Sequence, residues 1–333
     1  MNYLFWNTNR NDNNHILEEL IIDGDCDFVG LAEYNNDSGE LIELRKRLYD
    51  KGLIYYIVPD INDNRINILS RYEILPNYIF TDSKYFRIVS ISNSKGEKIL
   101  IAVVHFPSKL HIKESTMNSI LRSFRMKLED AEQILQFERL KELLDNIINM
   151  ATDKDIKDKL KIYNKSDLNI GDIIIKIGDV LIKEKKLYQY FEINKAYVLN
   201  RYTLVMGDFN INPFEDSMVN ADTLHALSSK NIAKKIRRIV YEESYDMFYN
   251  PMWNKLGDEN GDGTYYYNSS QITNYYWNIL DQFIVRPEIA DIVNVNDIKI
   301  ITQVGKYILK KDSGIPDKGI SDHFPLYFKL GGV

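Results

Sequence analysis

The 333-residue sequence contains a single cysteine, Cys26, so the chain cannot form an internal disulfide. This excludes the disulfide-rich scaffolds of small secreted domains and agrees with a reducing compartment. The sequence also lacks any apolar run near the about 20 residues that a membrane-spanning helix needs. Its N-terminus, MNYLFWNTNR, lacks the basic head and apolar core of a secretory signal. We therefore expect a cytoplasmic protein without a membrane span.

An excess of basic residues is missing as well. Asp and Glu total 48 against 42 Lys and Arg, which gives a net charge of -6 at pH 7. A protein that coats DNA through phosphate contacts is usually basic, so this role is disfavoured. An enzyme that holds nucleic acid briefly stays compatible with this charge, because a local patch such as KNIAKKIRR (230–238) can bind phosphates. Taken alone, that patch fits a solvated helix face better.

No linker rich in proline, glycine or serine divides the chain. The length suggests two domains at about 150 residues each, but large sandwich folds often occupy such a length as one. Apolar residues make up 44% of the sequence, which is typical of a globular protein. We interpret residues 1–333 as one domain, with a helical insertion at about 151–200, where the sequence is Lys-rich and least regular.

Short segments rich in β-branched and aromatic residues predict many strands, and helical spacing of apolar residues predicts helices between them. The predicted strands are residues 3–8, 27–32, 66–70, 87–92, 99–104, 203–206, 264–268, 279–285, 298–302 and 325–330. The predicted helices are residues 13–22, 39–50 and 114–150, the last with a break or bend near 125–130. Strands such as EKILIAVVH are apolar on both faces, which indicates a sheet covered on both sides.

Side chains that can bind a metal ion or a phosphate occur where these strands begin or end. They are Asn7, Glu33, His105, Asp208, Asn210, Asp322 and His323. Strand ends on a rigid sheet are common places for catalytic groups. Taken singly, each carboxylate also fits a helix cap or turn, and each histidine fits a structural role.

Asp281 lies inside the apolar segment NILDQFIV (278–285) and is expected to be buried. A buried carboxylate without a partner is costly, so Asp281 needs a donor. His323 is the attractive candidate, because a carboxylate on one imidazole nitrogen fixes the tautomer and stabilises the imidazolium.

The segment GDFN (207–210) places an acid and an amide two positions apart at the end of an apolar strand. In an extended chain, Asp208 and Asn210 point to the same side. The pair could hold a water or a metal-bound hydroxide, with the acid taking its proton and the amide fixing its position. Gly207 permits a close backbone approach or an unusual dihedral angle.

Seven segments, which occur in a fixed order along the chain, resemble the motifs of a known superfamily. They are LFWNTN, DFVGLAEY, INILSRYEI, AVVHFPSK, LVMGDFNINP, NILDQFIV and GISDHFPLYFKL. This series resembles the motifs of the superfamily of metal-dependent endonucleases, exonucleases and phosphatases related to pancreatic deoxyribonuclease. It spans residues 3 to 330 and is weakest from about 110 to 200. The resemblance implies a four-layered α/β sandwich, with two mixed β-sheets face to face, helices outside, and a site at one end of the sheets.

The resemblance also implies a divalent metal ion. Glu33 resembles the direct metal ligand, with Asn7 close to it and Asp322 as a second carboxylate on the metal side. Oxygen ligands without a Cys or His cluster favour Mg²⁺, or Mn²⁺, over zinc.

The resemblance assigns the remaining roles in phosphoester hydrolysis. Asp208 resembles the residue that orients or deprotonates the attacking water, with Asn210 as its helper. His323 resembles the histidine that contacts the phosphate, supported by Asp281.

Two further residues match positions near the substrate. His105 resembles a histidine that contacts the phosphate or assists the leaving group, whereas the abasic-site branch commonly has tyrosine chemistry there, which disfavours an abasic-site repair enzyme. Arg71 resembles an arginine near the substrate phosphates, and it fits a surface turn equally well.

The function implied is a Mg²⁺-dependent nuclease, endonuclease or exonuclease, with DNA or RNA as its substrate. The alternative is a phosphatase or phosphodiesterase that acts on a small phosphorylated molecule or a lipid headgroup. A catalytically silent binding protein fits less well, because every expected catalytic residue type is present.

Two segments near residue 265 resemble functional sites, but structural roles explain them more simply. DENGDG (258–263) copies the first half of a calcium loop, but Ser269 stands where a glutamate is needed, so we interpret it as a turn. TYYYNSSQITNYYW (264–277) could stack nucleic-acid bases. A half-buried strand surface explains these tyrosines more simply.

Overall fold

The computed structural model describes residues 1–36, 39–59, 65–93, 96–165, 169–257, 263–270 and 272–331. It contains two units, Met1–Leu128 with Tyr202–Val333, and Glu129–Arg201. The segment interpreted as a turn instead of a calcium loop falls largely on 258–262, which lie outside the described residues.

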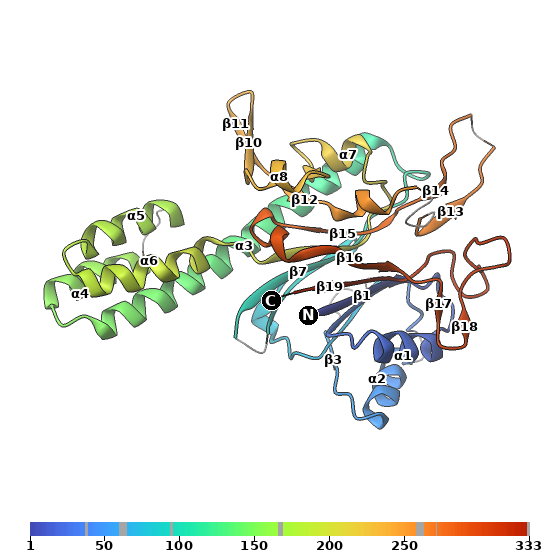
Figure 1. The fold of residues 1–333 in the computed structure, drawn as a ribbon, viewed down its shortest axis with the longest axis horizontal. Helices are drawn as coiled ribbons and strands as arrows, with labels where there is room; N and C mark the ends of the chain where they lie inside the picture. Colours follow the sequence, from blue (N-terminus) through green and yellow to red (C-terminus); the bar gives the residue numbers. More distant parts are fainter. Residues whose placement is uncertain are drawn as a thin grey trace. The chain divides into compact units, whose positions relative to one another are not determined.

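A six-stranded mixed sheet forms one half of the first unit (Figure 1), in the order β16-β19-β1-β2-β4-β3. Its strands are β1 (Asn2–Asn7), β2 (Phe28–Ala32), β3 (Tyr56–Ile57), β4 (Ile66–Ser70), β16 (Val293–Ile300) and β19 (Leu326–Leu330). β1 runs parallel to β2 and antiparallel to β19, and β4 runs antiparallel to β2.

A seven-stranded sheet forms the other half, in the order β5-β6-β7-β8-β15-β12-β9. Its strands are β5 (Ile79–Ser83), β6 (Phe86–Ser92), β7 (Lys98–His105), β8 (Thr203–Asp208), β9 (Ala226–Leu227), β12 (Phe248–Tyr249) and β15 (Asp281–Val285). β7 runs parallel to β8, and β15 runs antiparallel to β8.

The two sheets pack face to face through one apolar core. Alternation along β1 sends Tyr3 and Phe5 into this core, where they share a cluster with Val103 and Met206 of the other sheet. Phe283 of β15 stacks on Phe328 of β19, with ring centroids 3.9 Å apart. These contacts hold the strand ends of both sheets in a fixed relation.

Helices cover the outer faces of both sheets. Trp6, which alternates with Phe5, packs in a second cluster with α1 (Asn14–Asp23) and α2 (Glu40–Asp50). On the other sheet, Phe124 of α3 (Glu114–Met150) contacts Phe86 and Phe106. The layers are therefore helix, sheet, sheet and helix, which confirms the predicted four-layered α/β sandwich.

Shorter elements complete the first unit. The helical ones are α7 (Asp216–Val219), α8 (Lys230–Ala233) and the 3-10 helices η1 (Pro76–Tyr78), η3 (Pro251–Lys255) and η5 (Pro287–Ile292). The two-stranded pairs are β10 (Arg237–Val240) with β11 (Glu243–Asp246), β13 (Tyr265–Tyr267) with β14 (Tyr276–Asn278), and β17 (Gln303–Val304) with β18 (Tyr307–Ile308).

The basic patch 230–238 is not one helix face, as its simpler interpretation expected. Only α8 is helical, and the chain then turns into β10, which pairs with β11. Ile236, between the two, has a positive φ of 71°, which turns the chain into β10.

The second unit is helical. It contains the later part of α3 together with α4 (Lys154–Lys161), the 3-10 helix η2 (Ile162–Lys165), α5 (Ile170–Leu181) and α6 (Lys185–Leu199). Its core includes Leu144, Ile177 and Phe191. α3 is one uninterrupted helix, so the chain does not break near 125–130, where the segment has neither proline nor glycine to interrupt its hydrogen bonds. The alternative expectation, a bend there, stays a prediction.

Among the described helices, none combines the length and the apolar character that crossing a bilayer requires.

Candidate active site

Parallel strand pairs bring four of the predicted site residues to one end of the sandwich. Asn7 ends β1 and is paired with Ala32, so Glu33, the next residue, emerges beside it. His105 and Asp208 end β7 and β8 and are directly paired. Because each pair runs parallel, the polar residues that follow the apolar strands leave the sheets at the same edge.

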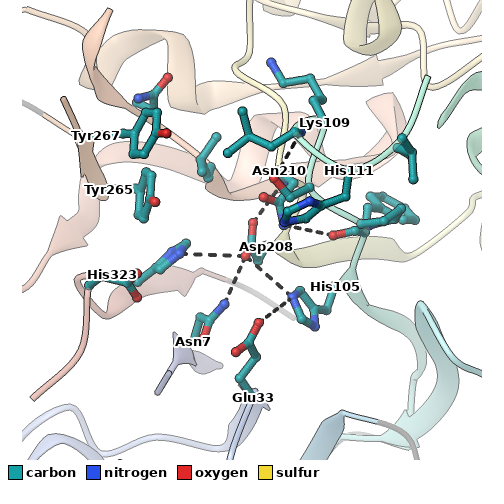
Figure 2. A pocket seen from close by; sticks show the side chains of 18 of the residues that line it. Asn7, Glu33, His105, Lys109, His111, Asp208, Asn210, Tyr265, Tyr267 and His323 are labelled. Atoms are coloured by element: carbon teal, nitrogen blue, oxygen red, sulfur yellow. Dashed lines mark hydrogen bonds and ion pairs between the residues drawn. The ribbon is translucent and has the colours of Figure 1, made fainter. Parts of the chain in front are cut away.

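Asp208 lies at the centre of this group and is only 1% exposed (Figure 2). Its carboxylate accepts a hydrogen bond from Asn7 Nδ2 at 3.0 Å and another from the backbone N–H of Asn210 at 2.9 Å. The Nε2 atoms of His105 and His323 each lie 3.9 Å from Asp208 Oδ2. One carboxylate therefore contacts groups from three other strand ends.

Gly207 and Asn210 shape the turn that follows β8. Gly207 has a φ of +151°, and a Cβ atom there would stand 2.0 Å from the Val104 carbonyl oxygen, so only glycine fits. Asn210 is in the left-handed region with a φ of 53°, and its side-chain amide donates to the Phe106 carbonyl oxygen at 2.8 Å. Asp208 and Asn210 face one pocket as predicted, but through this turn and not through an extended chain.

His323 and Asp281 form a buried pair. His323 Nδ1 lies 2.8 Å from Asp281 Oδ2, and Asp281 is fully buried. Burial disfavours the imidazolium, but the carboxylates of Asp281 and then Asp208 outweigh it and raise the pKa of His323 to about 10. The side chain is therefore a cation at neutral pH, held with Nε2 toward Asp208.

Glu33 meets His105 on the other side of Asp208. His105 Nε2 lies 3.3 Å from Glu33 Oε1, and Glu33 has a positive φ of 46°. The hydrogen bond from His105 lowers the pKa of Glu33, against the opposing effect of its partial burial. Glu33 is therefore a carboxylate at neutral pH, and it lines the pocket.

These side chains line one pocket of about 970 Å³. Seven of the nine predicted site residues line it, namely Asn7, Glu33, His105, Asp208, Asn210, Asp322 and His323. Asp281 stands behind His323 as its partner. All residues that line the pocket belong to the first unit.

Arg71 is not brought to this group. It follows β4, whose last residue, Ser70, pairs with Phe28 at the start of β2. Glu33 follows the other end of β2, about 13 Å away along the strand. Arg71 instead pairs with Asp25 at 2.6 Å and with Asp27 at 3.7 Å. The expectation that it contacts substrate phosphates is therefore replaced by the surface-turn interpretation.

The pocket also contains residues that sequence reasoning missed, namely the cationic or titratable residues Arg65, Lys84, Lys109 and His111. It further contains Tyr265, Tyr267 and Tyr275. These belong to the segment 264–277, for which the sequence offered base stacking as the alternative to a half-buried strand surface. Arg65 could have been found from the sequence, because it directly precedes the predicted strand 66–70. In the structure its carbonyl oxygen accepts a hydrogen bond from the backbone N–H of Glu33 at 3.0 Å. Lys109 pairs with Glu215.

One group of side chains in the described part of the chain offers enough closely spaced ligand atoms for a metal ion. It consists of Asp208, Asp281 and His323, with ligand atoms within 4.8 Å of one another. His323 is a poor ligand here, because its Nδ1 is engaged by Asp281 and the imidazolium has no free lone pair. The carboxylates that face the open pocket fit a cation better, since they bring an excess of negative charge and hard oxygen donors.

Comparison with known proteins gives fold-level likenesses. No protein-family model matches the sequence, and no curated protein matches it. An endonuclease/exonuclease/phosphatase family protein from Leptotrichia buccalis is similar in structure, with 14% identity, a TM-score of 0.47 and 99% of each chain covered.

Two other solved structures are similar to a comparable degree. An AP endonuclease from Archaeoglobus fulgidus has 12% identity and a TM-score of 0.45, with 99% of each chain covered. TDP2 from D. rerio, complexed with single strand DNA product, has 16% identity and a TM-score of 0.44, covering 98% of this chain and 97% of its own. Likenesses of this size say nothing about activity, which depends on the side chains of the site.

Proposed function

We propose that this protein is a divalent-metal-dependent phosphoester hydrolase, and specifically a nuclease that cleaves DNA or RNA phosphodiesters. The observation that carries the proposal is the position of Asp208, which is buried, lines the pocket and lies in reach of Asn7, His105 and His323. A carboxylate, an imidazolium and a neutral amide around one small volume are the groups that in-line hydrolysis requires.

The residues of this chain would share the reaction as follows. Asp208 takes a proton from the attacking water, and Asn210 helps to orient that water. The new P–O bond forms as the ester P–O bond on the opposite side of phosphorus breaks. The His323 imidazolium donates to a non-bridging oxygen, where negative charge develops. His105 lies beside the departing oxygen and supplies the proton with which it leaves. His105 then regains a proton from solvent, and Asp208 releases the proton that it took from water to solvent.

Glu33 would hold a Mg²⁺ ion, with Mn²⁺ as a substitute, and Asn7 and Asp322 would lie on the same side. When bound there, such an ion supplies positive charge that polarises the phosphate oxygens. The fit rests on the donor set, since Glu33, Asp208 and Asp322 place three carboxylates on a pocket whose deep cation is His323.

A nucleic-acid substrate is supported by the cations at the pocket rim. Arg65 and Lys84 are exposed and line the same pocket as Glu33. A pocket of about 970 Å³ also exceeds what a single phosphate group fills.

The first test is metal-dependent cleavage. We expect purified protein with Mg²⁺ to nick supercoiled plasmid or degrade an oligonucleotide, and EDTA to abolish this. Asp208→Asn and His323→Ala should lower kcat by at least about 100-fold, as loss of a catalytic proton acceptor or charge stabiliser does. Asp291→Asn is the matched control, because Asp291 pairs with Lys234 at the surface. Cleavage by Asp208→Asn at the rate of Asp291→Asn would refute the assignment.

The metal site has a test that does not depend on turnover. A ligand that binds only the folded state raises the melting temperature. Mg²⁺ should therefore stabilise the wild-type protein and stabilise Glu33→Gln less at the same concentration. Parallel assays with inositol phosphates and nucleotides measure the alternative substrate class; turnover there, without cleavage of any polynucleotide, would replace the nuclease by a phosphatase.

A further inference from the structure

Two tyrosines form an aromatic ladder on one wall of the pocket. Tyr265 and Tyr267 stand two positions apart on β13, so their side chains lie on the same face of the strand. Their rings are nearly parallel, with an interplanar angle of 16° and centroids 6.3 Å apart. Both residues line the pocket, and Figure 2 shows them one beyond the other, leading away from His323.

This ladder begins on the histidine of the active site. Tyr265 and His323 form an antiparallel backbone bridge, and the Phe324 N–H donates to the Thr264 carbonyl oxygen at 2.8 Å. The Tyr265 and His323 ring centroids are 4.7 Å apart. The backbone therefore fixes the start of β13 against the residue that would hold the phosphate.

The packing of the strand is carried by the residue between the two. Tyr266 contacts Trp277 edge to face, with centroids 5.2 Å apart, and Trp277 stacks on Phe324. Tyr267, by contrast, remains 36% exposed. Packing within the strand pair explains why Tyr266 is aromatic. It does not explain why two parallel aromatic rings, Tyr265 and Tyr267, stand on the pocket side of the same strand.

Beyond His323, the described residues around these rings include no cation. Burial raises the pKa of the Tyr265 hydroxyl, and the negative charge of Asp322 and Asp208, which lie near it, adds to this effect. The other pocket-lining residues on this side include the neutral Ser269, Thr273, Asn274 and Asn278. The rim cations Arg65 and Lys84 precede β4 and β6, on other parts of the pocket. A flat, uncharged group with hydrogen-bonding edges matches this wall better than a second phosphate does.

We propose that Tyr265 and Tyr267 form a nucleobase platform, on which the base of the nucleotide whose phosphate contacts His323 stacks. This inference rests on the proposed function, because it takes that phosphate to be held at His323. Stacking on an aromatic side chain contributes about 1–3 kcal/mol per base without requiring a particular sequence. The substrate is then a nucleotide strand with an unpaired base at the cleavage position.

The test compares two ligands under conditions that prevent cleavage. In EDTA, binding is measured for a short fluorescent thymidylate oligonucleotide and for a strand of equal length with abasic sites in place of the bases. Tyr267→Ala should weaken binding of the thymidylate strand by about 5- to 150-fold, the equivalent of one stacked base, and leave the abasic strand unchanged. Tyr267→Phe should retain wild-type binding, because the ring is kept.

A matched control is available in Tyr241, which is 97% exposed at the tip of the β10–β11 hairpin and does not line the pocket. Tyr241→Ala should bind both strands as the wild type does. Equal losses on both strands in Tyr267→Ala, or no loss on either, would overturn the platform.

A second readout reports stacking directly. The fluorescence of a 2-aminopurine base in the oligonucleotide falls when the base stacks, so saturating wild-type protein should quench it and saturating Tyr267→Leu should not. Equal quenching by both proteins contradicts the proposal.

Failure of the platform is distinguishable from failure of the nuclease. If cleavage depends on Asp208 but Tyr267→Ala cleaves as the wild type does, only the platform is refuted. If the wild type binds in a base-dependent way but does not cleave, only the proposed nuclease activity is refuted.

Discussion

The Asp281–His323 pair determines the pH range over which the candidate site holds a positive charge. Burial opposes the charge, yet Asp281 and Asp208 raise the pKa of His323 from 6.5 to about 10. The folded protein therefore keeps a proton that the unfolded chain loses near pH 6.5. The stability that this proton contributes is complete below pH 6.5 and disappears as the pH rises through about 10.

In Asp281→Asn the imidazolium loses its nearest counter-charge, so burial dominates and the pKa of His323 falls. We expect the basic limb of the pH profile of kcat/KM, near pH 10 in the wild type, to move toward neutral pH. The measurement is kcat/KM from acidic pH to beyond pH 10, with Asp291→Asn as a surface control. A basic limb that stays in place would show that Asp281 does not hold the proton on His323.

Gly207 is a second residue whose identity is dictated by geometry. A side chain at this position meets the Val104 carbonyl oxygen at 2.0 Å. Gly207→Ala should therefore lower the free energy of unfolding by about 3 kcal/mol, measured by urea denaturation.

Gly52 is the control that separates the cost of a steric clash from the cost of a positive φ in a residue with a side chain. It also has a positive φ, 80°, but a Cβ there would meet nothing within 4 Å. Gly52→Ala should lower the free energy of unfolding by only about 1–2 kcal/mol. Similar losses in the two variants would contradict the clash.

At the level of helices and strands, the buried strands were predictable because their apolar character is continuous. β4 occupies the predicted residues 66–70, and β8 begins at the predicted residue and runs two residues further. Parallel pairing then places the polar residues that follow such strands at one edge. The pairing of Asp281 with His323 followed from the cost of an unpaired buried charge.

The direction of a strand within its sheet was not predictable, and this misplaced Arg71. Both ends of β4 carry an arginine, Arg65 before it and Arg71 after it. Since β4 runs antiparallel to β2, its first end lies beside Glu33 and its last end lies at the opposite edge. The sequence shows which residues flank a strand, whereas the neighbours of the strand decide which flank reaches the site.

The β10–β11 hairpin was missed for a local reason. Its turn residues, Tyr241 and Glu242, both have positive φ, 48° and 70°. Such turns usually carry asparagine and glycine, so the sequence gives no turn signal there.

The first part of α3 supports the active site through aromatic packing. Phe124 contacts Phe106 with centroids 5.5 Å apart, and Phe106 contacts Phe209, the residue after Asp208, at 5.8 Å. Phe124→Ala should lower the free energy of unfolding by about 3–5 kcal/mol, because it leaves a cavity under the strand ends.

Met126 provides the control on the same helix, since its side chain is 65% exposed. Met126→Ala should change the free energy of unfolding by less than about 0.5 kcal/mol. Denaturation curves of both variants measure the difference, and equal values would mean that Phe124 does not anchor this layer.

For the whole molecule, the division into units assigns the candidate site to one unit alone. Every residue that lines the pocket lies in the first unit, and the second unit has its own apolar core. The segment predicted as a helical insertion, about 151–200, falls inside the second unit. Its status as an insertion in a single catalytic domain stays a prediction.

The net charge of -6 makes a last prediction about how nucleic acid binds. An acidic protein can neutralise only those phosphates that reach its local cations, here the His323 imidazolium, Arg65, Lys84 and, next to Glu215, Lys109. Each neutralised phosphate of a single strand contributes about -0.7 to the slope of log K against log salt concentration. We expect a slope of about -3 for an oligonucleotide in EDTA, and a shallower one, by about 0.7, in Lys84→Gln. Lys159→Gln, a surface change in the second unit, should leave the slope unchanged. A slope far steeper than this would mean that a basic surface outside the pocket carries the binding, with the residue 230–238 patch as the first place to look.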